Sequence, residues 1–513
     1  MTITPVVVGV GQSINRDDDD LAASEPVALI EAAARAAGDD GAVDLLAQLD
    51  VVEIMGVGSW WYDDLPGLVA QRLGADVAPG RRRMLPTGGE TPLRALDVAA
   101  ARIAAGDARV VLLAGAEGTR AVTRARRKAN GSSRDVPWTQ PSAPRPEWTL
   151  GPDLMGAQAL GIERAFDAFP LYEHGLRAME GRSFADAQAE SARLWAGLSS
   201  VAATNPYAWS RDPYDEAFLA SVSGIDGVGD NRMVAYPYTK HLVANPFVNQ
   251  GAALLVTDTE TARAHGIPED RWVYPWGGAG ADEPADPRAR DHYAHNRALE
   301  AAVQITQALT RTRLDDYDAV ELYSCFPVMP KLTARVLGMG SLGMETGTER
   351  AMPVSVTGGL SFAGGPGSNY LTHALAQMVL RLRESGGTGF LHGVGMFNTK
   401  HHCVVLSARP SPRGEYPDAP HDAAEPRPPL YDPVPVDDAY RGPLTVETLS
   451  VRFGRDGAPE RGIVLGRGRD GQRVGARLVD ADTLAALTDS TEPVGRTGTA
   501  VAAEPGRPPE FRI

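Results

Sequence analysis

Cysteine is nearly absent from this chain of 513 residues, which contains only Cys325 and Cys403. Two cysteines cannot build a disulfide framework, and such low usage is typical of a reducing compartment. Long apolar runs are also missing, since no stretch approaches the roughly 20 residues that a membrane-spanning helix requires. The first residues lack the charged region and apolar core of a signal peptide. We therefore expect a cytoplasmic protein without a membrane span.

Positive charge is scarce as well. The chain has 50 Lys and Arg against 65 Asp and Glu, a formal net charge of −15. This balance argues against a nucleic-acid partner, whose phosphates require a basic face, and against adsorption to anionic lipid. Hydrophobic residues at 43% and charged residues at 22% are ordinary for a globular protein. The length predicts two or three domains.

An internal repeat is the clearest feature that the chain does contain. In residues 85–115 a glycine pair precedes an Ala-rich helical pattern, a Gly106 turn and an apolar strand. We expect Thr91 to be the N-cap of that helix and Pro92 its first residue. Residues 364–395 repeat the order of glycine pair, helix, glycine turn and strand. Strands alternating with helices predict a parallel, layered α/β architecture, and the repeat predicts an internal duplication.

Composition divides the chain into successive regions. We expect one duplicated half over residues 1–265, with a longer and less regular insertion at 119–240, and a second half over 266–408. Residues 409–443 contain ten prolines, too many for a helix or a sheet, and predict an extended linker. Residues 444–513 carry five short strand patterns around one helical stretch, typical of a small β-barrel of the OB type.

Four motifs carry a resemblance to the thiolase superfamily. The position of the thiolase cysteine that opens a buried helix is Gly89 here. The Gly-His-Pro motif reads Gly364-Gly365-Pro366, so Gly365 replaces the histidine that activates the cysteine. The Cys-x-Gly motif reads Leu391-His392-Gly393, so Leu391 replaces the second cysteine. The remaining motif, Asn-Glu-Ala-Phe or, in the sterol-carrier-type branch, His-Asp-Cys-Phe, is matched by Tyr323-Ser324-Cys325-Phe326.

The resemblance implies a fold and also the loss of the usual chemistry. It implies an α/β protein with the duplicated thiolase fold, in which two βαβαβαββ halves form α-β-α-β-α layers and residues 119–240 are an inserted loop domain. Thiolase chemistry needs a thiolate, a base and oxyanion donors, and the reactive side chains are absent at the four matched motifs. Ordinary thiolases also lack a tail like residues 444–513. With that tail, the whole chain resembles the type-1 thiolase-like proteins of mycobacteria and their relatives.

Three side chains in these motifs are candidates for an altered chemistry. Tyr323 matches a tyrosine that does acid/base chemistry in bacterial steroid side-chain aldolases, whose second tyrosine corresponds to Phe362 here. Those aldolases work with a separate OB-type partner, of which residues 444–513 would be a fused analogue. Cys325 is either a small packed side chain or a reactive thiol. His392 either points into the pocket or supports strand packing.

A basic run at the start of the insertion is the candidate site for coenzyme A (CoA). The loop domain of thiolases holds CoA, so the resemblance implies that these side chains bind its phosphates; the alternative is a solvated charged face. The run consists of Arg120, Arg124, Arg126, Arg127 and Lys128. The acidic residues 17–20 are expected to form a solvated turn. We expect no metal site, because the consecutive residues His401, His402 and Cys403 would point to opposite faces of a strand.

Three functions follow from these observations as alternatives. The first is binding of CoA, acyl-CoA or a related lipid thioester, with no covalent cofactor and without normal acetyl-CoA acetyltransferase activity. The second is an altered enzyme on CoA thioesters, either an acyltransferase using Cys325 or His392 or a retro-aldolase using Tyr323. The third is a scaffold that acts through residues 444–513. Thiolases pair through their core sheets, but the added tail favours a monomer, so a monomer and a dimer both stay open.

Overall fold

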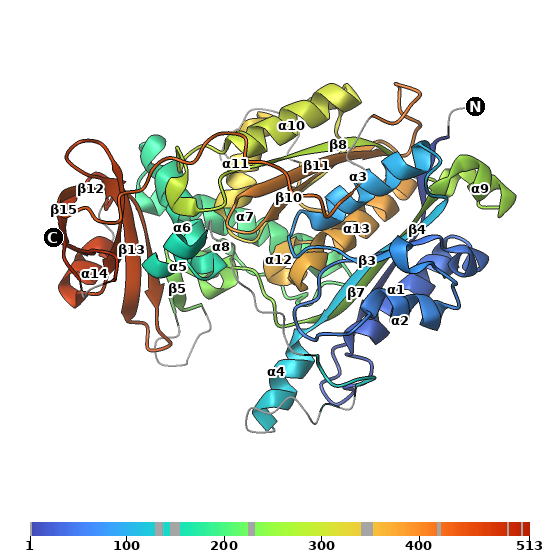
Figure 1. Ribbon diagram of the computed structural model, residues 1–513, viewed down its shortest axis with the longest axis horizontal. Coiled ribbons are helices and arrows are strands. Elements are labelled where there is room, and N and C mark those ends of the chain that lie inside the picture. Colours follow the sequence, from blue (N-terminus) through green and yellow to red (C-terminus); the bar gives the residue numbers. More distant parts are fainter. Residues whose placement is uncertain are drawn as a thin grey trace.

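The core of the protein is five layers of helix and sheet (Figure 1). Helices α3 and α13 lie between two sheets, α1 covers the outer face of the first sheet, and α10 covers the outer face of the second. This is the α-β-α-β-α arrangement, and the expected fold class is confirmed. The computed structural model describes residues 3–128, 136, 138–143, 154–223, 231–339, 352–417, 422–489, 492–503 and 506–513.

The first sheet contains five strands in the order β1-β7-β4-β2-β3. The strands and the helices of this half are β1 Pro5–Ile14, β2 Val51–Ile54, β3 Arg82–Met84, β4 Val110–Gly118, β7 Asn249–Asp258, α1 Pro26–Asp40, α2 Leu65–Leu73, α3 Thr91–Ala104 and α9 Thr259–Ala264. Only the β2–β3 and β2–β4 pairs are parallel. The expectation of a parallel sheet was therefore wrong for the other pairs, because β7 enters between β1 and β4 antiparallel to both.

The second sheet repeats this arrangement in the order β8-β11-β10-β9. Its strands and helices are β8 Tyr274–Asp282, β9 Ala319–Leu322, β10 Thr388–Gly395, β11 Lys400–Ser407, α10 Arg297–Thr310, α11 Val328–Leu337, α12 Gly359–Phe362 and α13 Tyr370–Ser385. In both sheets the first strand of the half lies at an edge (β1 or β8). Beside it lie, in this order, the last strand of the half (β7 or β11), the one before it in the sheet (β4 or β10) and the second (β2 or β9). In both, the last strand is antiparallel to its two neighbours. The duplication inferred from the repeat is thus present in the topology.

The two central helices begin just after the glycine pairs. The N-cap of α3 is Glu90, in helical conformation, so the expectation that Thr91 caps the helix was wrong by one residue. The Thr91 hydroxyl instead donates to the carbonyl oxygen of Pro86 at 3.2 Å. The turn after α3 uses Gly106 in the left-handed region, at φ 79°, as the repeat predicts. Twelve of the fourteen residues of α3 are buried, because sheets cover it on both sides.

The insertion between β4 and β7 is mainly helical. Its elements are α4 Thr119–Lys128, α5 Met155–Leu160, α6 Ala165–Met179, α7 Phe184–Thr204, α8 Glu216–Ala220, β5 Met233–Tyr236 and β6 Tyr238–Thr239. Helices α6 and α7 pack beside α11 and α12 of the second half. Among the residues that the structure describes, no helix combines the length and the apolar content that crossing a membrane would need.

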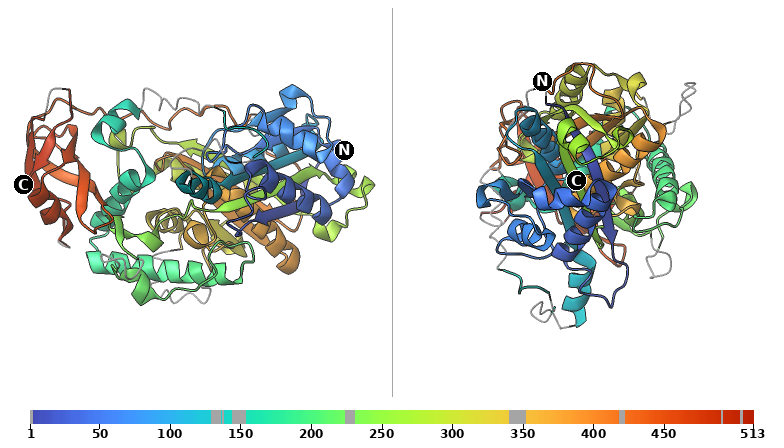
Figure 2. Two further views of the ribbon diagram at one scale, coloured as in Figure 1. Left: turned by 90° about the horizontal axis from the view of Figure 1, so that it is seen from below. Right: turned by 90° about the vertical axis from the view of Figure 1, so that its right-hand side faces the viewer.

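A five-stranded barrel forms the end of the molecule opposite the N-terminus (Figure 2). Its elements are β12 Gly442–Phe453, β13 Pro459–Arg467, β14 Arg473–Leu478, α14 Ala481–Thr488, β15 Thr497–Val501 and β16 Glu510–Arg512. The ring closes in the order β12-β13-β14-β16-β15-β12, with β14 and β16 parallel and α14 between the third and fourth strands. A small closed Greek-key barrel of five strands is the OB architecture that the sequence predicted.

The barrel is attached to the insertion. Strand β12 extends past the ring and pairs with β5, and the hydroxyl of Thr448 donates to the carbonyl oxygen of Leu171 in α6. The proline-rich segment reaches the barrel along the second sheet (Figure 1). It is held there by ordered contacts, such as Tyr416 Oη to Asp97 at 2.7 Å and Arg427 to Asp282 at 2.6 Å.

Candidate functional site

The four altered motifs converge at the N-terminal end of α3. The backbone N–H of Gly88 donates to Oγ of Ser368, which follows the Gly364-Gly365-Pro366 loop. A Cβ built on Gly393 of β10 would lie 2.9 Å from Cα of Glu90. Tyr323, at the end of β9, reaches Gly89 from the other side. The fold therefore brings together segments that are hundreds of residues apart, as the resemblance implies.

At Gly89 there is no room for the side chain of a nucleophile. A Cβ added there would lie 2.2 Å from Oη of Tyr323 and 2.3 Å from the carbonyl oxygen of Val394. Real Cβ atoms essentially never approach other heavy atoms so closely. The hydroxyl of Tyr323 thus occupies the space in which a cysteine at this position would begin. The tyrosine hydroxyl can lie at the helix start only because residue 89 has no side chain there.

Tyr323 is enclosed by apolar and aromatic neighbours. Its side chain is buried and makes an edge-to-face contact with Tyr370 at 5.7 Å between ring centroids. Burial raises the pKa of Tyr323 well above the usual value for a phenol, and the neighbouring Cys325 and Glu90 raise it further. The phenol is therefore neutral at physiological pH, so it can donate or accept a hydrogen bond or supply a proton as a general acid.

Glu90 is a polar residue of this site that the motif analysis missed. It is buried, and Oε2 has no hydrogen-bond partner among the described residues. Burial raises its pKa, while the positive charge of Lys400 opposes the rise. The carboxyl lies over glycine backbone, since a Cβ on Gly395 would be 1.8 Å and a Cβ on Gly88 2.4 Å from Oε2. The sequence did contain a signal that could have identified Glu90: an acidic residue directly after a glycine pair, where a helix begins.

The other residues of the Tyr323 motif pack into the core. The Ser324 hydroxyl accepts from the backbone N–H of Leu360 at 3.3 Å. Phe326 stacks on Phe169 with ring centroids 4.6 Å apart. Cys325 is buried, and burial raises the pKa of its thiol. Because the reactive form of cysteine is the thiolate, this environment favours the packing interpretation of Cys325.

Two further positions of the altered motifs differ in the space around them: Gly365, which replaces the activating histidine, and Leu391, which replaces the second cysteine. A Cβ on Gly365 would lie 3.4 Å from the carbonyl oxygen of Asn245, an ordinary contact, so this position could hold a side chain. Leu391 is fully buried in the main core cluster. The carbonyl oxygen of Asn245 also accepts the backbone N–H of Gly365 at 2.8 Å, which fixes the loop.

His392 lies on the face of β10 opposite Gly89. Gly393 faces Glu90, and neighbouring residues of a strand point to opposite faces. The ring of His392 is held between Thr333 Oγ1 of α11 at 3.0 Å and His401 Nδ1 of β11 at 3.1 Å. Burial lowers the pKa of His392 to about 3. Of its two interpretations, the structure supports strand packing.

The basic run forms the exposed side of α4 and is partly neutralised by the acidic turn. Arg120 makes two hydrogen bonds of 2.7 Å to the carboxylate of Asp18, and Arg124 pairs with the same carboxylate. Asp18 is therefore an ion-pair partner and not merely part of a solvated turn. The three residues at the end of the helix are exposed: Arg126, Arg127 and Lys128.

The sequence His401-His402-Cys403 alternates across β11. His401 faces His392, whereas His402 Nε2 lies 3.2 Å from Asp97 of α3. Cys403 is fully buried, and burial raises the pKa of its thiol. In the part of the chain that the structure describes, no group of three or more His, Cys, Asp or Glu side chains is placed to hold a metal ion.

Comparison with known proteins gives one match to a family model and several to solved structures. Residues 431–504 match the "Thiolase-like protein type 1 additional C-terminal domain". The crystal structure of a monomeric SCP2-thiolase like protein type 1 from Mycobacterium smegmatis is 28% identical, covers 99% of both chains and has a TM-score of 0.79. No curated protein is similar enough to count as a match.

Two more distant structures share the fold of the core. The Ltp2-ChsH2(DUF35) aldolase is 17% identical over 79% of this chain and 97% of its own, with a TM-score of 0.58. Human mitochondrial 3-ketoacyl-CoA thiolase in complex with CoA is 15% identical over 79% of this chain and 98% of its own, with a TM-score of 0.53. This chain therefore has the thiolase fold and resembles the type-1 thiolase-like proteins over its whole length, including their additional C-terminal domain.

Proposed function

We propose that this protein binds CoA or an acyl-CoA thioester and does not catalyse thiolysis. The observation that carries the proposal is the filled space at Gly89, where the Tyr323 hydroxyl stands in place of a nucleophile. The loss of the activating histidine at Gly365 supports the same conclusion, because a thiolase needs a base beside its thiol. The preserved scaffold supports retained binding, and a thiolase of this fold is known in complex with CoA.

The exposed end of α4 is the surface that we assign to the phosphates of CoA. Arg126, Arg127 and Lys128 project from it, and guanidinium groups suit phosphate oxygens through paired hydrogen bonds. Arg120 and Arg124 are engaged by Asp18, so we assign them the supporting role of positioning the helix.

Titration calorimetry with CoA and with acyl-CoAs of increasing chain length tests this proposal. We expect saturable binding that becomes about tenfold weaker in the Arg126→Gln/Arg127→Gln double variant, since losing charge-assisted bonds costs about 1.4 kcal/mol or more. Arg455→Gln, an exposed arginine on the barrel, is the matched control. Absence of saturable binding to every thioester, or thiolysis of acetoacetyl-CoA at a thiolase rate, would contradict the proposal.

A second candidate is an aldolase-type lyase that uses Tyr323. It is favoured by the position of the hydroxyl beside the buried carboxyl of Glu90. If it is correct, turnover of a CoA thioester should fall by at least about 100-fold in Tyr323→Phe, the usual size of a general acid/base contribution. Cys325→Ala and His392→Gln are the controls, and equal losses in all three variants would exclude a special role for the tyrosine.

We propose that the protein acts as a monomer in the cytoplasm. The monomeric state of the Mycobacterium smegmatis relative supports the first part, and the low cysteine content supports the second. Domain divisions after residues 265, 408 and 443 stay predictions of the sequence. A single species of about 54 kDa in light scattering, the mass of one chain, would agree with a monomer, and a doubled mass would not.

A further inference from the structure

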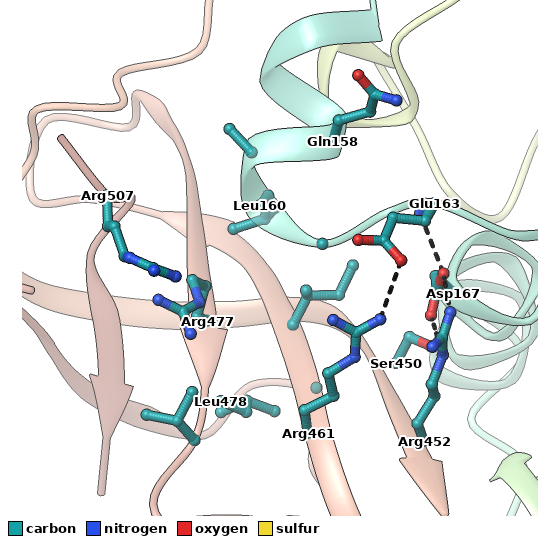
Figure 3. A pocket seen from close by; sticks show the side chains of 15 residues that line it. Gln158, Leu160, Glu163, Asp167, Ser450, Arg452, Arg461, Arg477, Leu478 and Arg507 are labelled. Atoms are coloured by element: carbon teal, nitrogen blue, oxygen red, sulfur yellow. Dashed lines mark hydrogen bonds and ion pairs between the residues drawn. The ribbon is translucent and has the colours of Figure 1, made fainter. Parts of the chain in front are cut away.

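A cavity of about 210 Å³ lies between the insertion and the barrel (Figure 3). The end of α5 and the start of α6 form one wall, and strands β12, β13 and β14 form the other. This seam pocket, as we call it, is separate from the site at Gly89 and from the basic helix α4. None of the residues that line it belongs to the altered thiolase motifs.

Positive charge dominates the seam pocket although the protein as a whole is acidic. Four arginines line it, against the two carboxylates of Glu163 and Asp167. Both carboxylates are already paired, Asp167 with Arg452 at 2.7 Å and Glu163 with Arg461 at 3.2 Å. The guanidinium charge of Arg477 therefore has no carboxylate of the lining as its partner.

Arg477 is the centre of this excess charge. It projects from β14, is half-buried, and its guanidinium has no hydrogen-bond or ion-pair partner in the described ranges of the chain. In Figure 3 its head group points into the space that the head group of Arg507 also approaches. A half-buried cation without a partner is less well stabilised than a paired one, and an anion in the pocket would supply that pairing.

The barrel topology explains why a pocket forms here. Strands β13 and β14 are the second and third strands of the ring, the face on which OB barrels bind their ligands. In this protein α5 covers that face, and Leu160 packs so closely that a Cβ on Gly475 would be 2.8 Å from its Cδ2. A polymer is therefore excluded, and the remaining volume lies below the roughly 300 Å³ at which pockets for larger organic ligands begin.

We propose that the seam pocket binds a small ligand through a phosphate or pyrophosphate group, with the fork of Arg477 as the main contact. Phosphate oxygens match the paired N–H donors of arginine. Because the ligand would touch both walls, its binding stabilises the attachment of the barrel to the insertion. This inference goes beyond the proposed CoA function, since it concerns a different surface of the molecule.

Calorimetric titration of the full chain with inorganic pyrophosphate and with inorganic phosphate, at constant ionic strength, tests the proposal. We expect at least one of the two anions to bind. Its affinity should fall at least tenfold in Arg477→Gln and less in Arg477→Lys, because lysine keeps the positive charge but lacks the paired N–H donors of the guanidinium. Arg469→Gln, an exposed arginine in the loop between β13 and β14, should bind like the wild type. Thermal unfolding of each variant checks that the fold is intact.

The same variants separate this proposal from the CoA proposal. Arg477→Gln should leave CoA binding unchanged, and Arg126→Gln/Arg127→Gln should leave pyrophosphate binding unchanged. The seam pocket proposal is overturned if neither anion binds the wild type at millimolar concentration, if Arg477→Gln and Arg477→Lys both bind with full affinity, or if Arg477→Gln weakens CoA to the same extent as pyrophosphate.

Discussion

Replacing Gly89 by alanine is expected to lower the free energy of unfolding by about 3 kcal/mol, at the upper end of the usual cost of overpacking a core. The added methyl group would overlap Oη of Tyr323, and a rotation of the tyrosine alone would not relieve the strain. The second close atom is the carbonyl oxygen of Val394, only 2.3 Å away and part of the β10 backbone. Urea unfolding of the wild type and the variant measures the difference.

Gly365→Ala is the matched control for this experiment. It changes the other altered glycine position, but its Cβ would meet nothing closer than 3.4 Å and its φ lies outside the left-handed region. We expect the free energy of unfolding to fall by less than about 1 kcal/mol, as is usual for a substitution that creates no steric clash. Equal stability of Gly89→Ala and the wild type would mean that the space at Gly89 is open, and the proposed loss of thiolysis would lose its main support.

Acidification is expected to destabilise the protein through buried neutral histidines, of which His373 is the clearest case. Its Nδ1 lies 2.8 Å from Oε1 of Gln12, and burial lowers its pKa to about 3. An unfolded histidine titrates near 6.5, so below that pH the unfolded chain takes up a proton that the folded chain refuses. Between pH 6.5 and 4.5 this costs about 2.3 kcal/mol. His373→Gln should reduce the slope of unfolding free energy against pH by about one proton over this interval.

Glu321 should act with the opposite sign. It is buried beside Tyr370 and Ser355, and burial raises its pKa to about 7 despite the hydrogen bonds from both hydroxyls. An unfolded glutamic acid titrates near 4.3, so raising the pH from about 4.5 to 7 removes stability, by about 3 kcal/mol. Glu321→Gln should abolish this loss. If both variants keep the wild-type slope, the burial of these two groups is not maintained in solution.

Local sequence patterns predicted most of the fold. The helix that follows the glycine pair at Gly88-Gly89 and the Gly106 turn after it follow from apolar spacing and from the permissive backbone of glycine. The repeat of glycine pair, helix, turn and strand predicted the duplication, because a repeated local pattern folds into a repeated unit. The antiparallel placement of β7 and β11 could not be predicted in this way, since strand direction depends on where the chain re-enters the sheet.

The candidate site was predictable only in part. The motif resemblance located Gly89, Tyr323 and Gly365, and the structure brings the segments that carry them to the same helix end. The resemblance could not tell that Gly89 is closed while Gly365 has room, because each is the second glycine of a pair and the two positions look alike in the sequence. The orientation of His392 and the pairing of Arg120 with Asp18 likewise depend on residues far away in sequence.

The sequence by itself determined which reactive groups are missing at the thiolase positions: that residues 89 and 391 are not cysteine and that residue 365 is not histidine is read from the sequence and needs no coordinates. Only the tertiary structure decided what fills the vacated positions and where unbalanced charge remains. The hydroxyl of Tyr323 at Gly89 and the guanidinium of Arg477 in the seam pocket are both consequences of packing between distant segments. Such contacts arise from close packing of the folded chain, in which each side chain must fit the volume that its neighbours leave.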